Sequence, residues 1–237
     1  LEEQRRILAP LRAVEANQEA LRTAAEKLDA VEASLLHAEF GDYDPSMLSG
    51  RAPLSSLGTI QSGVAKGRPA EPLTTTEVPY LRVANVKDGA LDLNDVQQIT
   101  VEKTRVQQYL LRHGDVLMTE GGDLDKLGRG TVWQGEVAGC VHQNHVFAVR
   151  PDTSRLNPWY LAALARSSFG RGYFQKCAKR TSNLASVNKK ELGEFPVQEA
   201  SLERQNAFVE TWRALRQQRV QLESRVGQLR GLKRRLI

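Results

Sequence analysis

The sequence predicts an α+β protein in which two long helices bracket one globular domain with a mixed or antiparallel sheet. Three observations carry this prediction. The two ends of the chain repeat each other, apolar residues recur every seven positions within both ends, and the segment between them contains short strands and turns, with helices late. We expect a first coiled-coil helix over residues 1–40, the globular domain over 41–200 and a second coiled-coil helix over 201–237.

The repeat emerges when Leu1 is placed on Leu202, which aligns LEEQRRI with LERQNAF and keeps later apolar residues in register. A spacing of seven residues is typical of a helix that packs along another helix. Because the first helix enters the globular domain and the second leaves it, the two are predicted to pair in antiparallel orientation. The residues expected in this seam are Val14, Leu21, Leu28, Leu35, Leu215, Leu222, Leu229 and Leu236.

A second row of the predicted seam is partly polar, because it includes Gln18 and Glu32 in the first helix and Arg219 and Lys233 in the second. The two helices also differ in charge. The first carries five basic and eight acidic side chains, and the second carries nine basic and three acidic ones. Opposite charge favours pairing of the helices with each other, modestly and in a salt-dependent way. Pro10 is expected to kink or delay the first helix, since proline lacks the N–H that a helix interior needs.

The globular domain is predicted from turn residues and alternation. The run from Gly41 to Pro45 ends the first helix, because it combines residues that break helices. Asn157 and Pro158 have the chemistry of a helix N-cap and first turn, and a further helix is expected near Tyr173 and Phe174. Strands are expected within residues 79–86, 114–122, 130–137 and 140–151, the last two as a strand pair around Ala138 and Gly139.

The segment from Lys176 to Lys190 is the strongest indication of nucleic-acid binding. It holds five positive charges and no acid, with short hydrogen-bonding side chains between its basic ends. Lys and Arg neutralise phosphates, while Asn bonds an adenine edge through two hydrogen bonds. A solvated basic loop would have the same composition. His142 and Asn144 would share one face of a regular strand, either as base readers or as a polar face.

No catalytic centre is predicted. Cys140, His142 and His145 lack the second ligand cluster of a zinc site, and the acid-x-Lys spacing of a nuclease fails because position 124 is Leu124. Nucleotide-binding, methyl-donor and adenine-methylating motifs are absent from the sequence. Two cysteines make no disulfide framework, and no apolar run or signal pattern indicates a membrane or export. A cytoplasmic location is therefore expected.

Four phrases of the globular domain, PYLRVANV, GDVLMTEGGDLDKLGRG, HQNHVFAVRP and TSNLASVNKKEL, resemble those of target-recognition domains in type I restriction–modification specificity subunits. The junction Phe195-Pro196-Val197, followed by LERQ, resembles the passage from such a domain into its conserved helix. LEEQRRI resembles the same passage with the preceding domain removed. Each phrase alone is weak, but together they are specific, and the resemblance covers essentially the whole chain.

The resemblance implies a non-catalytic subunit that reads one half of a split site in double-stranded DNA, while the helices set the unread gap. It implies methylation subunits that dock on the helices and use S-adenosylmethionine, restriction subunits in a larger assembly, and no cofactor bound by this chain. One recognition domain is present where the full subunit has two. The chain is then an excised fragment, a natural half-subunit that forms a homodimer, or part of something longer.

The alternative to a DNA-reading subunit is a coiled-coil interaction module, such as an inhibitor or assembly factor of such a complex. The steepness with which salt weakens binding to long duplex DNA discriminates between the two. The resemblance does not transfer base-contacting residues, because recognition domains differ most there. Chosen by side-chain chemistry, the candidate DNA-contacting residues are Arg82, Asn85, Lys126, Arg129, His142, Asn144, Lys179, Arg180, Thr181, Asn183, Asn188 and Lys189.

Overall fold

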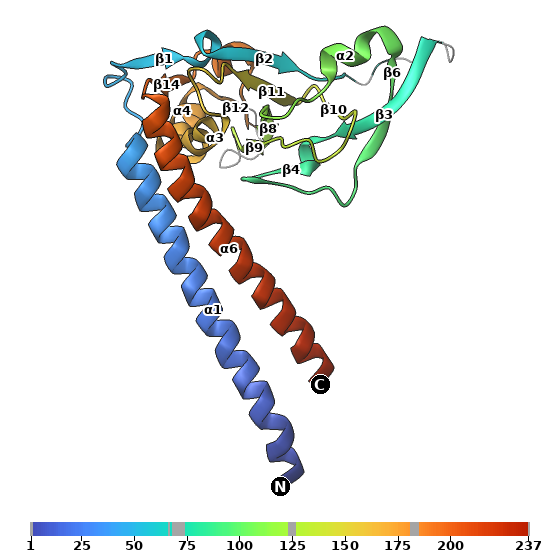
Figure 1. The fold of residues 1–237 in the computed structure, drawn as a ribbon, viewed down its shortest axis with the longest axis vertical. Coiled ribbons are helices and arrows are strands. Elements are labelled where there is room, and N and C mark those ends of the chain that lie inside the picture. Colours follow the sequence, from blue (N-terminus) through green and yellow to red (C-terminus); the bar gives the residue numbers. More distant parts are fainter. Residues whose placement is uncertain (1, 66, 68–73, 123–126, 181–184, 237) are drawn as a thin grey trace. The chain divides into compact units, whose positions relative to one another are not determined.

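The computed structural model describes residues 2–65, 67, 74–122, 127–180 and 185–236 (Figure 1). The chain divides into two compact units. The helical unit comprises Leu1–Ala38 and Glu210–Ile237, and the globular unit comprises Glu39–Val209. Both divisions fall inside long helices, so that the last residues of one helix and the first two turns of the other belong to the globular unit.

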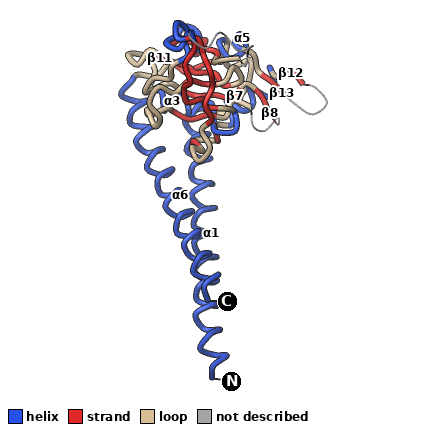
Figure 2. The backbone as a smooth tube through the Cα atoms, turned by 90° about the vertical axis from the view of Figure 1, so that its right-hand side faces the viewer, coloured by secondary structure: helices blue, strands red, loops and turns tan. Residues whose placement is uncertain are grey.

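Two helices of more than thirty residues make up the helical unit: α1 (Glu2–Phe40) and α6 (Leu202–Leu236). Pairs of side chains join them along their length, among them Glu32 with Trp212, Asp29 with Arg219, and Glu15 with Lys233. Residue numbers rise along α6 as they fall along α1, so the helices are antiparallel, and Figures 1 and 2 show them side by side. The predicted architecture of two paired long helices and an α+β globular part is confirmed.

The predicted heptad positions of α1 and α6 whose side chains the structure describes are buried or half-buried. Val14 is buried, with 6% of its surface exposed. The leucines of the same row are half-buried, as expected where a single pair of helices covers only one side of each. These leucines are Leu21, Leu28 and Leu35 on α1 and Leu215, Leu222 and Leu229 on α6, whereas the side chain of Leu236 lies outside the described part.

The second row of the seam contains the best-buried polar group of the helical unit. Glu32 is only 6% exposed and accepts a hydrogen bond of 2.9 Å from Nε1–H of Trp212, which is itself 2% exposed. A guanidinium nitrogen of Arg216 lies 3.5 Å from the same carboxylate oxygen. Near the middle of the pair, a groove of about 390 Å³ is lined by small residues, Ala25 and Gly227, and by a charged rim.

The largest sheet of the globular unit is antiparallel, in the strand order β2-β11-β7-β9. A second sheet has the order β10-β3-β6 and is mixed, because β10 is parallel to β3 while β6 is antiparallel to it. The strands of these two sheets are β2 (Gly58–Ser62), β3 (Thr75–Leu81), β6 (Gln97–Glu102), β7 (Val116–Thr119), β9 (Gly130–Val132), β10 (Val141–His142) and β11 (Val146–Pro151).

Three smaller sheets complete the globular unit. The first pairs β1 (Arg51–Pro53) with β14 (Pro196–Gln198), and the second pairs β4 (Val86–Lys87) with β5 (Ala90–Leu91). In the third, β13 (Ala185–Ser186) lies between β12 (Lys179–Arg180) and β8 (Gly121–Gly122). Short helical segments lie between the strands: α2 (Val106–Tyr109), α3 (Pro158–Arg166), α4 (Ser168–Cys177), α5 (Lys189–Gly193) and the 3-10 turns Leu54–Ser56, Val83–Asn85 and Lys103–Arg105.

The strand pair that the sequence predicts around Ala138 and Gly139 is wrong. β9 pairs with β7, and β7 pairs in turn with β11, so β7 lies between the two segments that were expected to be neighbours. The second segment also breaks into two strands, because a turn in which Val146 N–H donates to the Gln143 carbonyl separates β10 from β11. The local turn signal was therefore outweighed by pairing with a strand from earlier in the chain.

The interior of the globular unit is densely apolar. One cluster surrounds Trp133, Leu117 and Val146, each at most 1% exposed. A second consists of aromatic rings, in which Phe195 stacks on Phe174 with centroids 4.8 Å apart. These contacts fix the positions of the surface turns.

Within the globular unit, helix α3 packs against the last residue of α1 and the first turns of α6. It begins as predicted, because the Asn157 side chain accepts a hydrogen bond from Trp159 N–H and Pro158 occupies the first turn. The ring of Tyr160 packs edge-on against Phe40 at the end of α1 and Phe208 near the start of α6, at 5.0 and 5.6 Å.

Polar contacts surround this aromatic group. Glu39 accepts hydrogen bonds from the Tyr160 hydroxyl at 2.7 Å and from Arg204 at 3.0 Å. The Gln205 amide is 1% exposed and is fully used, because it accepts from Asn157 N–H and donates to the carbonyls of Arg155 and Ala200. Within the globular unit, the end of α1 and the start of α6 are thus held by the same few residues.

Candidate nucleic-acid interface

The basic segment from Lys176 to Lys190 begins at the end of α4, and its described parts, 176–180 and 185–190, include β12, β13 and the start of α5. Figure 2 shows β12, β13 and β8 together at one edge of the globular unit. In the ladder, Lys179 lies opposite Ser186, and Ser186 lies opposite Gly121. Lys179 and Ser186 are both exposed. Directly opposite residues project from the same face of a sheet, so an ammonium group and a hydroxyl group are presented together.

The strand next to them, Gly121–Gly122, carries no side chains. A Cβ atom at Gly121 would lie 3.1 Å from the Ala185 carbonyl oxygen, closer than such contacts normally come. Glycine therefore allows this strand to approach β13. It also leaves a bare stretch of backbone beside β13, on the side away from the basic strand β12, which another chain can approach closely.

Helix α5 follows this sheet and uses one of the candidate residues for its own structure. The Asn188 side chain accepts from Glu191 N–H at 2.9 Å, and the Glu191 carboxylate accepts from Asn188 N–H at 2.8 Å. This reciprocal cap occupies the amide oxygen of Asn188. Lys189 and Lys190 are exposed beside it, and Lys190 lies 4.0 Å from Glu194.

A rigid turn between β10 and β11 lies next to the same edge. Backbone hydrogen bonds join Gln143 to Leu81 and Asn144 to Val64, at 2.8 and 3.0 Å. The Gln143 side chain accepts from Val83 N–H. The turn is therefore fixed from several sides, and its polar side chains are displayed on an immobile support.

His142 lies beneath this turn and is fully buried. Its Nδ1 is 2.6 Å from the Val146 carbonyl oxygen, so Nδ1 carries the proton and donates. Desolvation by burial lowers the pKa of His142, against smaller opposing effects of that hydrogen bond and of Asp115. The side chain does not reach the surface, and it supports the turn rather than offering a contact to a duplex.

Asn144 and His145 are the outward side chains of the turn. The Asn144 amide nitrogen lies 3.4 Å from Nε2 of His145, and Nδ1 of His145 lies 2.5 Å from a carboxylate oxygen of Glu120. Glu120 is bonded through its backbone both to His145 and to Val187, just beyond β13. The turn and the small basic sheet are thus contiguous.

Two candidates selected by residue type, Asn85 and Arg82, are hydrogen-bonded within the turn that follows β3. Asn85 is 3% exposed, and its amide donates to the carbonyls of Asp92 and Asp95 while accepting from Arg82 N–H. The Arg82 guanidinium pairs with the Asp95 carboxylate at 2.7 Å. Asn85 therefore closes the turn that follows β3 from inside the fold, whereas the Arg82 side chain is 31% exposed and is paired with Asp95 at the surface.

The remaining candidates are less completely placed. Arg129 is half-buried beside β9, and its backbone carbonyl accepts from Thr119 N–H. Arg180 contributes its backbone to β12. The predicted sites at Lys126, Thr181 and Asn183 lie outside the described residues. Glu120 and His145 were not among the candidates, although their adjacency to Gly121 and Asn144 was a usable signal.

The cysteines offer no reactive thiolate. Burial raises the pKa of Cys140 to about 12 and that of Cys177 to about 11. Both side chains therefore remain protonated thiols near neutral pH, the form that is a poor nucleophile and a poor metal ligand.

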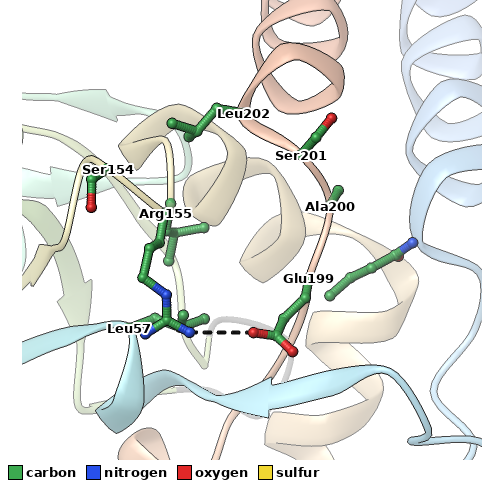
Figure 3. Close-up of a pocket in the computed structure, with 9 residues that line it drawn as sticks. Leu57, Ser154, Arg155, Glu199, Ala200, Ser201 and Leu202 are labelled. Carbon is green, nitrogen blue, oxygen red and sulfur yellow. Dashed lines mark hydrogen bonds and ion pairs between the residues drawn. The ribbon is translucent and has the colours of Figure 1, made fainter.

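A surface pocket of about 230 Å³ lies near the start of α6, in the globular unit. Figure 3 shows Arg155 reaching across it to Glu199, with a separation of 3.3 Å. Arg155 also donates to the Ser56 carbonyl. Glu199, the one acid among the residues that line the pocket, is thus paired with Arg155. The pocket is therefore better explained as a junction between structural elements than as a catalytic site.

No protein-family model matches the chain. Two curated proteins do. The chain is 23% identical over 128 residues to the type I restriction enzyme MjaX specificity subunit of Methanocaldococcus jannaschii, a match that covers 54% of this chain and 30% of that protein. It is 26% identical over 119 residues to the type I restriction enzyme EcoKI specificity subunit of Escherichia coli, covering 48% of this chain and 25% of that protein.

Solved structures share the fold over the whole length. The HsdS subunit from Thermoanaerobacter tengcongensis matches with a TM-score of 0.56 at 20% identity, covering 100% of this chain and 57% of that one. The type I S subunit from M. genitalium matches with a TM-score of 0.59 at 15% identity, covering 99% and 59%. A chain from a structure of complex assembly in the type I R-M system matches with a TM-score of 0.62 at 21% identity, covering 100% and 58%.

This chain therefore spans somewhat more than half the length of the solved structures that it matches. Its matches to the two curated relatives cover less than a third of the length of each of those proteins. None of the described helices is both long enough and apolar enough to cross a bilayer. With sequence similarity over about half of the chain and a shared fold over all of it, the resemblance to type I restriction–modification specificity subunits is confirmed.

Proposed function

We propose that this chain is a DNA-reading specificity subunit, or part of one, in a type I restriction–modification system. The globular unit reads one half of a bipartite duplex site, and the helical unit sets the spacing and docks the methylation subunit. The observation that carries the proposal is the basic edge of β12, β13 and α5. There Lys179, Lys189 and Lys190 are exposed on a unit that has the fold of specificity subunits.

The edge suits a duplex for electrostatic and steric reasons. Ammonium groups that neutralise phosphates release counterions, so that affinity falls steeply as salt rises. The side-chain-free strand β8 belongs to the same small sheet as Lys179 and lets a bulky backbone come near. The turn carrying Asn144 adds hydrogen-bonding groups that phosphate contact alone does not need.

The test is binding of the chain to long duplex DNA over a range of salt concentrations. Replacing Lys179 and Lys189 by Ala is expected to weaken binding to every sequence and to reduce the salt slope by about one for each lost phosphate contact. The matched control is Lys27→Ala, an exposed lysine on α1. Binding that is absent, or insensitive to salt, would contradict DNA reading and favour an interaction module.

The helical unit carries features expected of a docking surface for methylation subunits. Val31, Val220 and Leu232 are 50%, 60% and 39% exposed, so apolar groups face outward on helices that already bury one seam. We expect Val220→Asp to reduce co-purification with the cognate methylation subunit while leaving duplex binding by the chain intact. S-adenosylmethionine belongs in this proposal to that partner, and restriction subunits join in a larger assembly.

The other half of the bipartite site requires a second recognition domain. It is supplied either by another segment of a longer protein or by a second copy in a homodimer. The oligomeric state of the chain in solution, measured by light scattering, separates these cases.

A further inference from the structure

We propose that Asn144 reads an adenine base and that His145 and Glu120 are positioning residues that hold its amide in the reading orientation. This inference rests on the proposed function, because it assigns the chemistry by which the globular unit recognises its half-site. The three side chains form a chain of hydrogen bonds, Glu120 to His145 to Asn144, on the surface beside the basic sheet.

Backbone hydrogen bonds hold the turn that carries Asn144 to other segments of the globular unit. Two backbone carbonyls of the turn accept hydrogen bonds from other segments: Val64 N–H donates to the His142 carbonyl at 2.7 Å, and Glu120 N–H donates to the His145 carbonyl at 3.0 Å. Gly63 passes so close to His142 that a Cβ atom there would clash with its carbonyl oxygen. A base reader needs such support, because a loosely held amide loses discrimination.

The proton positions follow from the partners. In the neutral tautomer that donates Nδ1–H to Glu120, Nε2 of His145 is an acceptor. Nε2 faces the Asn144 amide nitrogen at 3.4 Å, so the amide points its nitrogen toward the ring. The carbonyl oxygen and the second N–H of Asn144 are then available for a partner. An amide that offers one acceptor and one donor matches N6–H and N7 of adenine in the major groove.

Stability does not explain these contacts. The side chain of His145 is 56% exposed and that of Glu120 is 28% exposed. Ion pairs with such exposure contribute little to folding. The buried His142 and the half-buried Gln143 already hold the backbone of the turn through their hydrogen bonds. The outer three groups therefore serve orientation of a surface amide.

The experiment selects bound sequences from a pool of randomised duplexes with the full chain and then measures affinities for single-base variants of the selected site. For Asn144→Ala we expect the preference for adenine at one position to fall about tenfold. Affinity for non-specific duplex should stay unchanged, because the amide contacts no phosphate. Asn94→Ala, an exposed asparagine elsewhere on the globular unit, is the matched control.

The positioning role is tested at Glu120. Glu120→Ala should lower the same preference, whereas Glu120→Gln should retain most of it, because glutamine still offers an oxygen acceptor to Nδ1–H. Glu136→Gln and Glu136→Ala serve as controls at an exposed glutamate. Melting temperatures of all variants show whether a loss of preference reflects unfolding. His145→Ala tests the positioning role a second time, and it decides the question if Glu120→Ala melts early.

The outcomes separate the two levels of the proposal. If the wild-type chain selects a sequence and Asn144→Ala leaves every position of it unchanged, the assignment of Asn144 is overturned while DNA reading stands. If Asn144→Ala removes the preference but Glu120→Ala and His145→Ala do not, the positioning role is overturned. If the wild-type chain binds no duplex, the proposed function fails, and the assignment fails with it.

Discussion

Helices α1 and α6 are joined by half-buried leucines and by pairs of charged side chains, whereas the globular unit is joined by side chains with almost no exposure. Glu32, Asp29 and Glu15 on α1 each meet a donor on α6. In the globular unit, Trp133 and Phe195 are at most 1% exposed. The comparison teaches that pairing of the helices is specified by charge placement, while the globular fold is specified by shape.

The largest expected difference between the two regions concerns large-to-small substitutions. Phe195→Ala should lower the free energy of unfolding by about 3–5 kcal/mol, since it empties a fully buried aromatic site. Leu222→Ala should cost about 1–2 kcal/mol, because the side chain is only half-buried and less area is lost. Urea unfolding followed by circular dichroism measures both. Equal losses would break the distinction between seam and core.

A second substitution tests the buried acid of the seam. Glu32→Ala leaves Nε1–H of Trp212 buried without its acceptor, which costs about 2 kcal/mol. Glu32→Gln retains an oxygen acceptor and should recover about half of that loss. The readout is the melting temperature of the chain at low and high salt. A stability unchanged by Glu32→Ala would show that the buried carboxylate is dispensable to the pairing.

The third prediction concerns pH and belongs to the globular unit. Burial holds the pKa of His142 below 6.5, so the unfolded chain binds a proton that the folded chain refuses. Stability is therefore full above pH 6.5 and declines as pH falls toward the lowered pKa, by at most about 1.4 kcal/mol per pH unit. The charged groups that act on the ring are Asp115, which favours protonation, and Arg150, which opposes it.

The measurement for His142 is the free energy of unfolding between pH 7 and pH 5 for the wild type and for His142→Gln. The variant should lose this part of the pH dependence. His113→Gln, an exposed histidine, should retain it. Parallel pH curves for the wild type and His142→Gln would show that another group titrates.

The smallest expected effect concerns the exposed ion pair between Asp29 and Arg219, which are 2.8 Å apart. Arg219→Ala should cost about 0.5 kcal/mol at low salt and less at high salt, because solvent and ions screen the pair. Exchanging the two charges, Asp29→Arg with Arg219→Asp, should restore part of the loss. If the exchange is no better than either single substitution, charge placement does not specify the register.

The sequence was sufficient for features that depend on local or repeated chemistry. The seven-residue spacing predicted the antiparallel helices, and Asn157 with Pro158 predicted the start of α3. Pro10 was expected to kink or delay α1, but the helix includes it from Glu2 onward. The start of the helix is therefore not delayed, although a proline in the third turn cannot donate the backbone hydrogen bond of a helix interior.

Long-range pairing and burial were beyond the sequence. The local pattern indicated a strand within residues 114–122, but not that this strand, β7, lies between β9 and β11. Asn85 and His142 have the side chains of base readers, yet both are buried and bonded within the fold. Residue type alone does not distinguish a polar group that supports a turn from one that the turn displays.

The contacts around Tyr160 have a consequence for how the gene segment that encodes the globular unit can be exchanged. The ring of Phe40, where the globular unit begins, lies 5.3 Å from the ring of Phe208, where it ends. A unit whose entry and exit are neighbours can be replaced as one block without moving the segments on either side. A stretch of gene that preserved Glu39, Phe40, Gln205 and Phe208 at its borders could therefore be exchanged for another by recombination, and the new block would join the same two helices through the same few side chains.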